Sequence, residues 1–499
     1  MKSKKINLID YSHDRNDHYK DTANKLYQLI NEYSNQQELD KVYEYFEKKY
    51  KLPSIKVKQT LKQYIVRSYL LKSAKFNNKL RIKHIPLYIL KYGALIYGLF
   101  FSKLKKKKKK KFNLIIDYIT SSIEMKRWEK LIDLYGKNSV LCITRDTNLI
   151  KEFPDYNFHN QKLFRDFLFS DLIKSIFFEF FFGIWVILKA SLKTKVNLFP
   201  VALNIIHTYL AFKSLFRSYK APFLIQEKHY NTEPIKNILF KRYGGLASTS
   251  IQKNIIATEP IFFYMDLDIL FSLGKNSIGQ AYNYGGRIDI VYPVGSLFME
   301  RGWFDKKIIE NKKFDLAILG INTSNAYERL DSFSEFMDDH YSLYRWAAKL
   351  SIEKPDIKIV VIHHTSAGED IIHDNILFGS NVIVLDKMNN SYDIAFSSKC
   401  AVTYGSTMGY ELNAHNLPTF FVDPGNRCMF LPEKGLNYLD KMRVNSYESF
   451  QALVTNHIKK TNREKIFLDE FRNLCIESSH VSNNIFNFLT NFKMKKNFK

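Results

Sequence analysis

The sequence predicts an α/β protein with two βα domains that face each other across a cleft. Short apolar runs typical of buried strands alternate with segments of helical periodicity, first over residues 112–295 and again over residues 296–475. Residues 1–111 are polar, basic and helix-prone, and residues 476–499 combine a short helix with a basic tail. We therefore expect a helical extension, an N-terminal domain, a C-terminal domain and a terminal helix, in that order.

Composition narrows the choice of partners. The 499 residues carry a formal net charge of +25, and 15% of them are aromatic, so the basic character belongs to a folded chain. An excess of lysine favours an anionic partner, which could be membrane lipid, nucleic acid or an acidic polymer. The four cysteines are scattered without metal-ligand spacing, and the N-terminus lacks the apolar core of a signal peptide, so we expect a cytoplasmic protein with free thiols.

An apolar segment beside a lysine run favours contact with a membrane surface. Ile85–Phe101 is slightly short for a bilayer span, and Lys105–Lys111 follows it closely. One interpretation is a helix lying on the inner face of the cytoplasmic membrane, with the lysines on anionic headgroups. The other is a core helix followed by a solvated linker. We prefer the first, because the apolar and charged runs are adjacent.

The first βα domain begins with a strand at Phe112–Ile119. Ser121 or Ser122 is expected to cap a helix that ends at Gly136, and the next strand covers Ser139–Thr144. Two further strands, Phe223–Gln226 and Ala247–Ile251, flank another helix. Between these units, residues 164–215 are strongly apolar and aromatic. We expect them to pack as helices on the sheet, and the alternative is a surface for lipid or a polyprenyl acceptor.

The second βα domain has polar residues where its strands end. Its predicted strands are Phe314–Leu319, Ile357–Ile362 and Val382–Leu385, and a helix covers Ser334–Leu350. The first of these strands is followed by Gly320 and Asn322, and the second by His363 and His364. Because the carboxyl ends of parallel strands share one edge, these residues should gather there. The two histidines could contact a donor phosphate or could be structural.

Residues 391–425 form the most informative stretch. A strand at Ala401–Thr403 leads into the turn Gly405–Thr407, a helix at Met408–His415 and a strand at Thr419–Val422. The backbone N–H groups and hydroxyls of a Gly-Ser-Thr turn, at the positive end of a helix dipole, can hold a phosphate. The alternative is that Ser406 or Thr407 only caps the helix.

Glu411 adds a second feature to this turn. It lies four residues after Thr407, about one helical turn further on and on the same face. A carboxylate there could accept hydrogen bonds from both hydroxyls of a ribose. Phosphate donors beside a ribose acceptor, at the carboxyl end of a strand, predict a nucleotide site.

The stretch Val402-Thr-Tyr-Gly-Ser-Thr-Met-Gly-Tyr-Glu411, together with the His363-His364 pair, resembles the GT-B-fold glycosyltransferases of bacterial surface polysaccharide assembly. Similar groups are the capsule transferases that transfer Kdo or sialic acid, and the CDP-glycerol glycerophosphotransferases. Ala247–Asn254 and Ile288–Ser296 resemble, respectively, the strand with a Gln-His-Gly segment and the joint between domains. The resemblance covers roughly residues 112–475 and implies a GT-B-like pair of Rossmann-like domains.

The resemblance also implies roles for individual residues. Glycosyl or polyol phosphate would be transferred from a nucleotide-activated donor to a glycan or lipid-linked acceptor, with no metal, no other cofactor and no nucleic acid. The acceptor would lie near Gln252, with Glu227 or His229 as general base and His364 assisting departure of the nucleotide. The implied donor site comprises Gly320, Asn322, His363, His364, Gly405, Ser406, Thr407 and Glu411.

Two departures from the family pattern bear on activity. Where such enzymes show Gln-His-Gly, this chain has Gln252-Lys253-Asn254, and where they show His-Pro it has His363-His364. An inactive GT-B-like protein therefore stays open, as does a nucleotide-sugar epimerase of similar fold. Charge alone suggests a nucleic-acid binder, but the lysines lack interleaved aromatics. Asp266-Leu-Asp268 looks like a manganese-binding D-x-D, which we discount because its surroundings are apolar.

Overall fold

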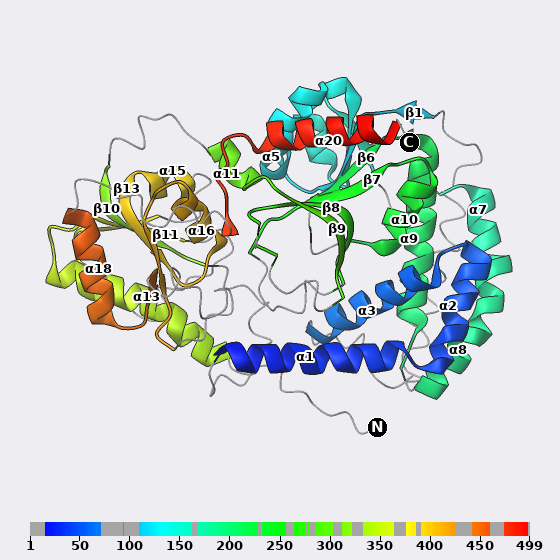
Figure 1. The fold of residues 1–499 in the computed structure, drawn as a ribbon, viewed down its shortest axis with the longest axis horizontal. Coiled ribbons are helices and arrows are strands. Elements are labelled where there is room, and N and C mark those ends of the chain that lie inside the picture. Colours follow the sequence, from blue (N-terminus) through cyan, green and yellow to red (C-terminus); the bar gives the residue numbers. More distant parts are fainter. Residues whose placement is uncertain are drawn as a thin grey trace.

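The chain is described by a computed structural model in which two parallel sheets stand side by side (Figure 1). The residues that it describes are 15–70, 93, 109–161, 167–194, 196–227, 229, 232–255, 264–275, 277–278, 285–302, 312–321, 333–363, 376–385, 391–425, 442–459 and 474–497. Most of the predicted membrane-surface segment, residues 85–108, lies outside them, as do Asn322 and His364.

Within residues 15–70 of the N-terminal extension, three helices pack on the first domain. Their buried side chains, such as Leu26, Phe46 and Leu61, belong to the same hydrophobic cluster as Ile115 and Leu224 of the first sheet. The extension is therefore part of the first domain's core and not a detached arm. The three helices are α1 (Arg15–Ser34), α2 (Gln37–Tyr50) and α3 (Ser54–Leu70).

The first sheet has seven parallel strands in the spatial order β4-β3-β2-β6-β7-β8-β9. From β2, the strands β3 and β4 follow one another toward one edge of the sheet, and β6 to β9 follow one another toward the other edge. The direction in which the chain adds strands therefore reverses between β2 and β6, which is the switch point of a Rossmann-like sheet. The strands are β2 (Leu114–Ile119), β3 (Val140–Thr144), β4 (Asn157–Asn160), β6 (Phe223–Gln226), β7 (Ala247–Ile251), β8 (Asp266–Ser272) and β9 (Arg287–Pro293). A separate two-stranded pair joins β1 (Lys110–Lys111) to β5 (Tyr219–Lys220).

The second sheet has six parallel strands in the order β12-β11-β10-β13-β14-β15. This is the 3-2-1-4-5-6 order of a doubly wound sheet, with its switch point between β10 and β13. The predicted fold class, two Rossmann-like βα domains after a helical extension, is confirmed. The strands are β10 (Phe314–Leu319), β11 (Ile359–Ile362), β12 (Val382–Leu385), β13 (Ser398–Thr403), β14 (Thr419–Val422) and β15 (Arg443–Val444).

Helices cover both sheets, and local signals set their ends. In α5, the Ser121 side chain accepts a hydrogen bond from Glu124 N–H at the start, and Gly136 ends the helix at φ +82°. The helices around the first sheet are α5 (Ser122–Tyr135), η2 (Lys137–Ser139), α6 (Thr147–Glu152) and α10 (Pro234–Arg242). Those of the second domain are α11 (Leu297–Gly302), α13 (Phe333–Glu353), α15 (Ser391–Phe396), α16 (Thr407–Ala414) and α18 (Tyr447–Lys459).

The C-terminal helix α20 (Val481–Asn497) returns to the first domain and lies along α5 (Figure 1). Val481, Ile485 and Leu489 are buried in the cluster that contains Leu114 and Phe223. The helix is longer than predicted, because its Ser, Asn and Lys positions carry no apolar spacing. The chain thus ties the second domain to the first through its last segment.

The apolar segment of the first domain forms four helical stretches. Only part of it is buried as predicted: α9 is packed in the core, whereas α8 leaves large apolar side chains exposed. By length and hydropathy α9 could cross a membrane, but 72% of that window is buried within the protein, as in a core helix. The stretches are α7 (Phe169–Ile173), the π-helix η3 (Lys174–Phe180), α8 (Phe181–Thr194) and α9 (Phe199–Ser218).

Candidate functional site

The strand ends of the second sheet meet at one edge, as the sequence predicts. Leu319 pairs in register with Ile362 on one side and with Thr403 on the other. Gly320 and His363 therefore follow their strands side by side, and Gly320 N–H donates to the Ile362 carbonyl at 2.9 Å. This places both residues next to the switch point between β10 and β13, where open α/β sheets bind ligands.

The Gly405–Thr407 turn opens α16 at this switch point. Ser406 is the N-cap, and its Oγ accepts a hydrogen bond from Met408 N–H at 3.2 Å. Ser406 N–H in turn donates to Thr403 Oγ1 at 3.3 Å, which ties the turn to the end of β13. Ser406 therefore caps the helix, which is the alternative that the sequence left open. The cap uses a lone pair of the Ser406 hydroxyl and not its proton, so the hydroxyl can still donate to an anion.

Glu411 lies one turn further along α16 and is only 2% exposed. Its carboxylate accepts hydrogen bonds from the hydroxyls of Tyr392, on α15, and Ser296. Burial raises the pKa of Glu411, against the lowering effect of these bonds and of the Arg127 charge. The carboxylate therefore already accepts two hydroxyls, the same chemistry that two ribose hydroxyls would offer. Ribose binding would require it to exchange those partners.

A second polar cluster lies at the carboxyl edge of the first sheet. Glu227 directly follows β6, and its N–H donates to the Asp117 carbonyl of β2 at 2.7 Å, at the switch point. Lys253, just after β7, forms an ion pair with the Glu227 carboxylate and lies 3.7 Å from Glu124 Oε1. Burial lowers the pKa of Lys253, while both carboxylates raise it. One ammonium thus lies between two carboxylates.

His229 is fully buried behind this cluster. Its Nδ1 accepts a hydrogen bond from the backbone N–H of Lys253 at 3.3 Å. Burial, together with the Lys253 charge, lowers the pKa of His229 to about 3. The imidazole is therefore neutral at pH 7 and a weak base, and of the two predicted bases Glu227 fits the role better.

Gln252 has all of its hydrogen-bonding capacity occupied. Its Nε2 donates to the carbonyls of Asn254 and Ser277, each at 2.8 Å. Its Oε1 accepts from Leu273 N–H at 3.0 Å and from Ser277 Oγ at 2.6 Å. With two donors and two acceptors used, the side chain holds the loops after β7 and β8 together. The predicted contact with the acceptor stays a prediction.

The two edges touch each other. Ile255 N–H, from the loop after β7, donates to Thr407 Oγ1 at 3.3 Å. Arg127 of α5 stacks at 3.6 Å on the ring of Phe298, and its charge acts on both Lys253 and Glu411. The Gly-Ser-Thr turn and the Glu227–Lys253 cluster therefore belong to one region between the two sheets.

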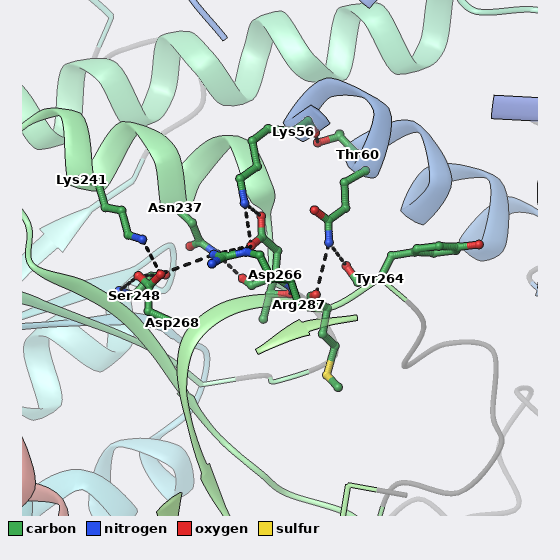
Figure 2. A network of polar contacts seen from close by, with 12 residues as sticks. Lys56, Thr60, Asn237, Lys241, Ser248, Tyr264, Asp266, Asp268 and Arg287 are labelled. Atoms are coloured by element: carbon green, nitrogen blue, oxygen red, sulfur yellow. Dashed lines mark hydrogen bonds and ion pairs between the residues drawn. The ribbon is translucent and has the colours of Figure 1, made fainter. Parts of the chain in front are cut away.

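The Asp266-Leu-Asp268 segment serves ion pairing (Figure 2). Asp266 lies 2.7 Å from Lys56 of α3 and 2.7 Å from Arg287 of β9. Asp268 pairs with Lys241 and accepts from Ser248 N–H at 2.8 Å. Among the residues that the structure describes, no group of three or more His, Cys, Asp or Glu side chains is placed to hold a metal ion.

Several residues of this region had no role in the sequence-based prediction. Glu124 could have been found, because Ser121 and Glu124 have the spacing of a capping box, and Glu124 accepts from Thr120 N–H at 2.7 Å. Lys253 was noted only as a departure from a family pattern. Arg127 lies on a helix far from the motifs. Tyr392 lies within the stretch 391–425, but nothing in the local pattern relates it to Glu411, 19 positions further on.

Comparison with known proteins gives structural likenesses alone. No protein-family model and no curated protein matches the sequence. The S. aureus MnaA–UDP co-structure matches at 10% identity with a TM-score of 0.46, covering 76% of this chain and 97% of that one. Methanocaldococcus jannaschii UDP-GlcNAc 2-epimerase gives 8% identity, a TM-score of 0.43 and coverages of 77% and 100%. Acinetobacter baumannii MurG matches at 10% identity with a TM-score of 0.42, covering 77% of this chain and 99% of that one. Likenesses at this level do not identify a family.

Proposed function

We propose that this protein is a glycosyltransferase that uses a nucleotide-activated donor. The observation that carries the proposal is the hydrogen bond between Ile255 N–H and Thr407 Oγ1. It brings a helix-opening hydroxyl turn at the switch point of one sheet against a carboxylate–lysine cluster at the switch point of the other. Such an arrangement offers a phosphate site and a proton acceptor on opposite sides of one space, as group transfer requires.

In this proposal the second domain binds the donor. The N–H groups at the start of α16 and the hydroxyls of Ser406 and Thr407 contact the donor phosphate, at the positive end of the helix dipole. Gly320 and His363 lie beside them on the same edge. Glu411 exchanges its Tyr392 and Ser296 partners for the ribose hydroxyls. The predicted roles of Asn322 and His364 are retained as proposals.

The first domain then binds the acceptor. An acceptor hydroxyl attacks the sugar carbon bonded to the donor phosphate, its proton passes to Glu227, and the nucleotide leaves with the bonding electron pair. Before the step, the Lys253 ammonium forms an ion pair with the Glu227 carboxylate. The nucleotide leaves as an anion, whose charge is stabilised by the turn at Ser406 and by Arg127 nearby.

The cellular setting is proposed from charge and sequence. A net charge of +25 and the lysine run at 105–111 support a peripheral protein at the inner face of the cytoplasmic membrane, acting on a glycan or lipid-linked acceptor. Assembly of a surface polysaccharide is the proposed process. We propose no metal and no nucleic acid.

Calorimetry with two conservative variants tests the donor site. Ser406→Gly removes a hydroxyl while costing the helix cap only about a few tenths of a kcal/mol, and Thr407→Val removes a hydroxyl at nearly constant volume. The double variant should bind the donor roughly tenfold or more weakly, because two hydrogen bonds to a charged group are lost. Ser446→Gly is the matched control, because its Oγ likewise accepts a backbone hydrogen bond at a helix start, from Ser449 N–H of α18 in the same domain. Equal affinity in double variant and wild type would remove the donor site.

An epimerase uses the same kind of donor, so binding does not separate the two activities. Incubating the protein with the nucleotide sugar that it binds, in the absence of acceptor, separates a transferase from an epimerase. A transferase leaves the sugar's configuration unchanged until acceptor is added. Epimerised donor in the absence of acceptor would assign the site to the alternative.

A further inference from the structure

Helix α8 and the preceding π-helix carry an aromatic face that the fold leaves exposed. We define this face by Phe177, Phe178, Phe181, Trp185 and Leu192. Phe178 and Phe181 are each 62% exposed and Trp185 is 69% exposed. Phe181, Trp185 and Leu192 recur at helical spacing, so they lie on one side of α8. A contiguous exposed patch of large apolar side chains is typical of an interaction surface.

The opposite side of α8 is held firmly against the N-terminal extension. A Cβ at Gly183 would lie 2.2 Å from the ring of Tyr45 on α2, so the two helices meet at the closest approach that glycine allows. Tyr45 O–H donates to the Glu179 carbonyl at 2.7 Å, and Ile187 and Ala190 are buried. The orientation of the aromatic face is therefore fixed by packing on the other side.

The exposed charges of residues 174–194, the helical stretch that carries the aromatic face, are positive. Lys174, Lys189 and Lys193 are exposed along the same helical stretch. Its one carboxylate, Glu179, is buried and lies 3.6 Å from Lys174 Nζ. Exposed aromatics flanked by lysines are typical of a helix that lies in a membrane interface, with rings among the acyl chains and ammonium groups on anionic headgroups. A second copy of this chain would bring like charges together.

We propose that this aromatic face docks the protein on an anionic lipid surface. The helix lies in the interface plane, and Phe178, Phe181 and Trp185 enter the headgroup boundary. The contact is separate from the lysine run at 105–111, on which the sequence-based expectation depended. This inference rests on the proposed function, in which the acceptor is linked to a lipid at the membrane. It names the surface through which the protein reaches that membrane.

Intrinsic fluorescence and sedimentation with vesicles test the proposal. The probe is vesicles of equal parts phosphatidylglycerol and phosphatidylcholine, with pure phosphatidylcholine as the reference. Binding should shift the tryptophan emission to shorter wavelength in the wild type and much less in Trp185→Phe. Of the other tryptophans, Trp128 is buried, Trp346 packs against a hydrophobic core and Trp303 lies outside the described residues. The double variant Phe178→Glu/Phe181→Glu should partition roughly tenfold or more weakly. The matched control is Ile352→Glu, which places a carboxylate at a 67% exposed apolar position on α13.

The outcomes separate the possibilities. Weaker partition in the double variant alone supports the proposal, and so does a wavelength shift that depends on Trp185. Equal partition of the double variant and the wild type overturns the proposal and assigns membrane binding to lysines outside the aromatic face. A dimer that the double variant abolishes, without vesicle binding by the wild type, also overturns it in favour of a second copy. Nucleotide-donor calorimetry on the same samples reports independently on the proposed function.

Discussion

The first sheet carries two buried charge clusters, one at each end, and they differ in what surrounds them. At the amino end, Asp266 and Asp268 are matched by Lys56, Lys241 and Arg287, which come from helix α3, helix α10 and strand β9 (Figure 2). At the carboxyl end, the Glu227–Lys253 pair borders the loop that touches the second domain. Both clusters contain buried ion pairs between residues far apart in the sequence.

The difference shows that burial of charge alone does not identify a functional site. The Asp266 cluster joins three elements of one folding unit, and its carboxylate oxygens are taken up by cations and amides, so it serves assembly. The Glu227 cluster lies at a switch point, where neighbouring strands diverge and leave room for a ligand. Position relative to the sheet's carboxyl edge, rather than the residue types, distinguishes the two.

The largest expected effect is on stability at the amino-end cluster. Asp266→Asn leaves Lys56 and Arg287 facing a neutral amide, and losing one partner of a buried ion pair costs about 3–5 kcal/mol of unfolding free energy. Denaturant unfolding measures the loss. Asp289→Asn removes the half-exposed partner of the same Arg287 and should cost less than about 1 kcal/mol. Similar losses for the two variants would contradict the assignment of Asp266 to the buried network.

A substitution in the carboxyl-end cluster should lower the rate of transfer. Glu227→Gln removes the proposed proton acceptor, so transfer should fall about 10²–10⁴-fold while donor affinity is unchanged, since the donor lies on the second domain. Steady-state kinetics and calorimetry on one preparation give both quantities. Glu129→Gln, at a half-buried position of α5, is the control. Full activity of Glu227→Gln would exclude it as the base.

Three histidines of the described residues should make stability depend on pH. Burial lowers the pKa of His229 to about 3 and the pKa values of His207 and His415 to about 4. Their unfolded-state pKa is about 6.5, so below that pH the unfolded chain binds protons that the folded chain does not. Stability is therefore full above about pH 6.5 and falls toward pH 4, by up to about 1.4 kcal/mol per pH unit for each histidine.

Denaturant unfolding between about pH 7 and pH 5 measures this slope, because most carboxylates stay ionised there. His415→Gln keeps an acceptor for Ser478 N–H, which lies 3.0 Å from His415 Nε2, and should lower the slope by about one histidine's share. An unchanged slope would mean that His415 is not buried in its neutral form.

The smallest expected effect concerns the turn at the start of α16. Ser406→Ala should cost about 1 kcal/mol of unfolding free energy because Met408 N–H loses its cap, whereas Ser406→Gly should cost only a few tenths. Both remove the hydroxyl, so both should weaken donor binding equally. A variant pair whose affinities follow their stabilities instead would assign Ser406 to capping alone.

Much of the fold follows from local pattern. Strands β6, β7, β10, β12 and β14 have the predicted bounds, although the edge strand β12 is partly exposed and only its apolar run marked it. The Ser121 cap and the Gly136 end of α5 were likewise readable from residue type. The outward face of α8 was predicted only as the alternative to burial, because hydrophobicity does not say which side of a helix packs against the rest of the protein. Nor does any local signal relate Lys56 to Asp266, 210 positions away.

The candidate site was predictable at the level of sheet edges. Gly320, His363 and Ser406 each follow a strand, and parallel strands in neighbouring positions bring such residues together. What the pattern could not supply is the partner of each group. Glu411 meets Tyr392 and Lys253 meets Glu227 only because two helices and two loops converge, which depends on the tertiary arrangement.

The central claim is that the two facing edges hold a nucleotide-activated donor, and a thermal-shift panel tests it most directly. Purified protein is heated with CMP-, CDP-, UDP- and GDP-linked donors, each in excess. One class should raise the melting temperature, since a ligand at about 100 times its Kd stabilises the folded state by about 2.7 kcal/mol. The Thr407→Val/Ser406→Gly variant should lose that rise. A folded wild-type protein whose melting temperature no donor changes would contradict the account.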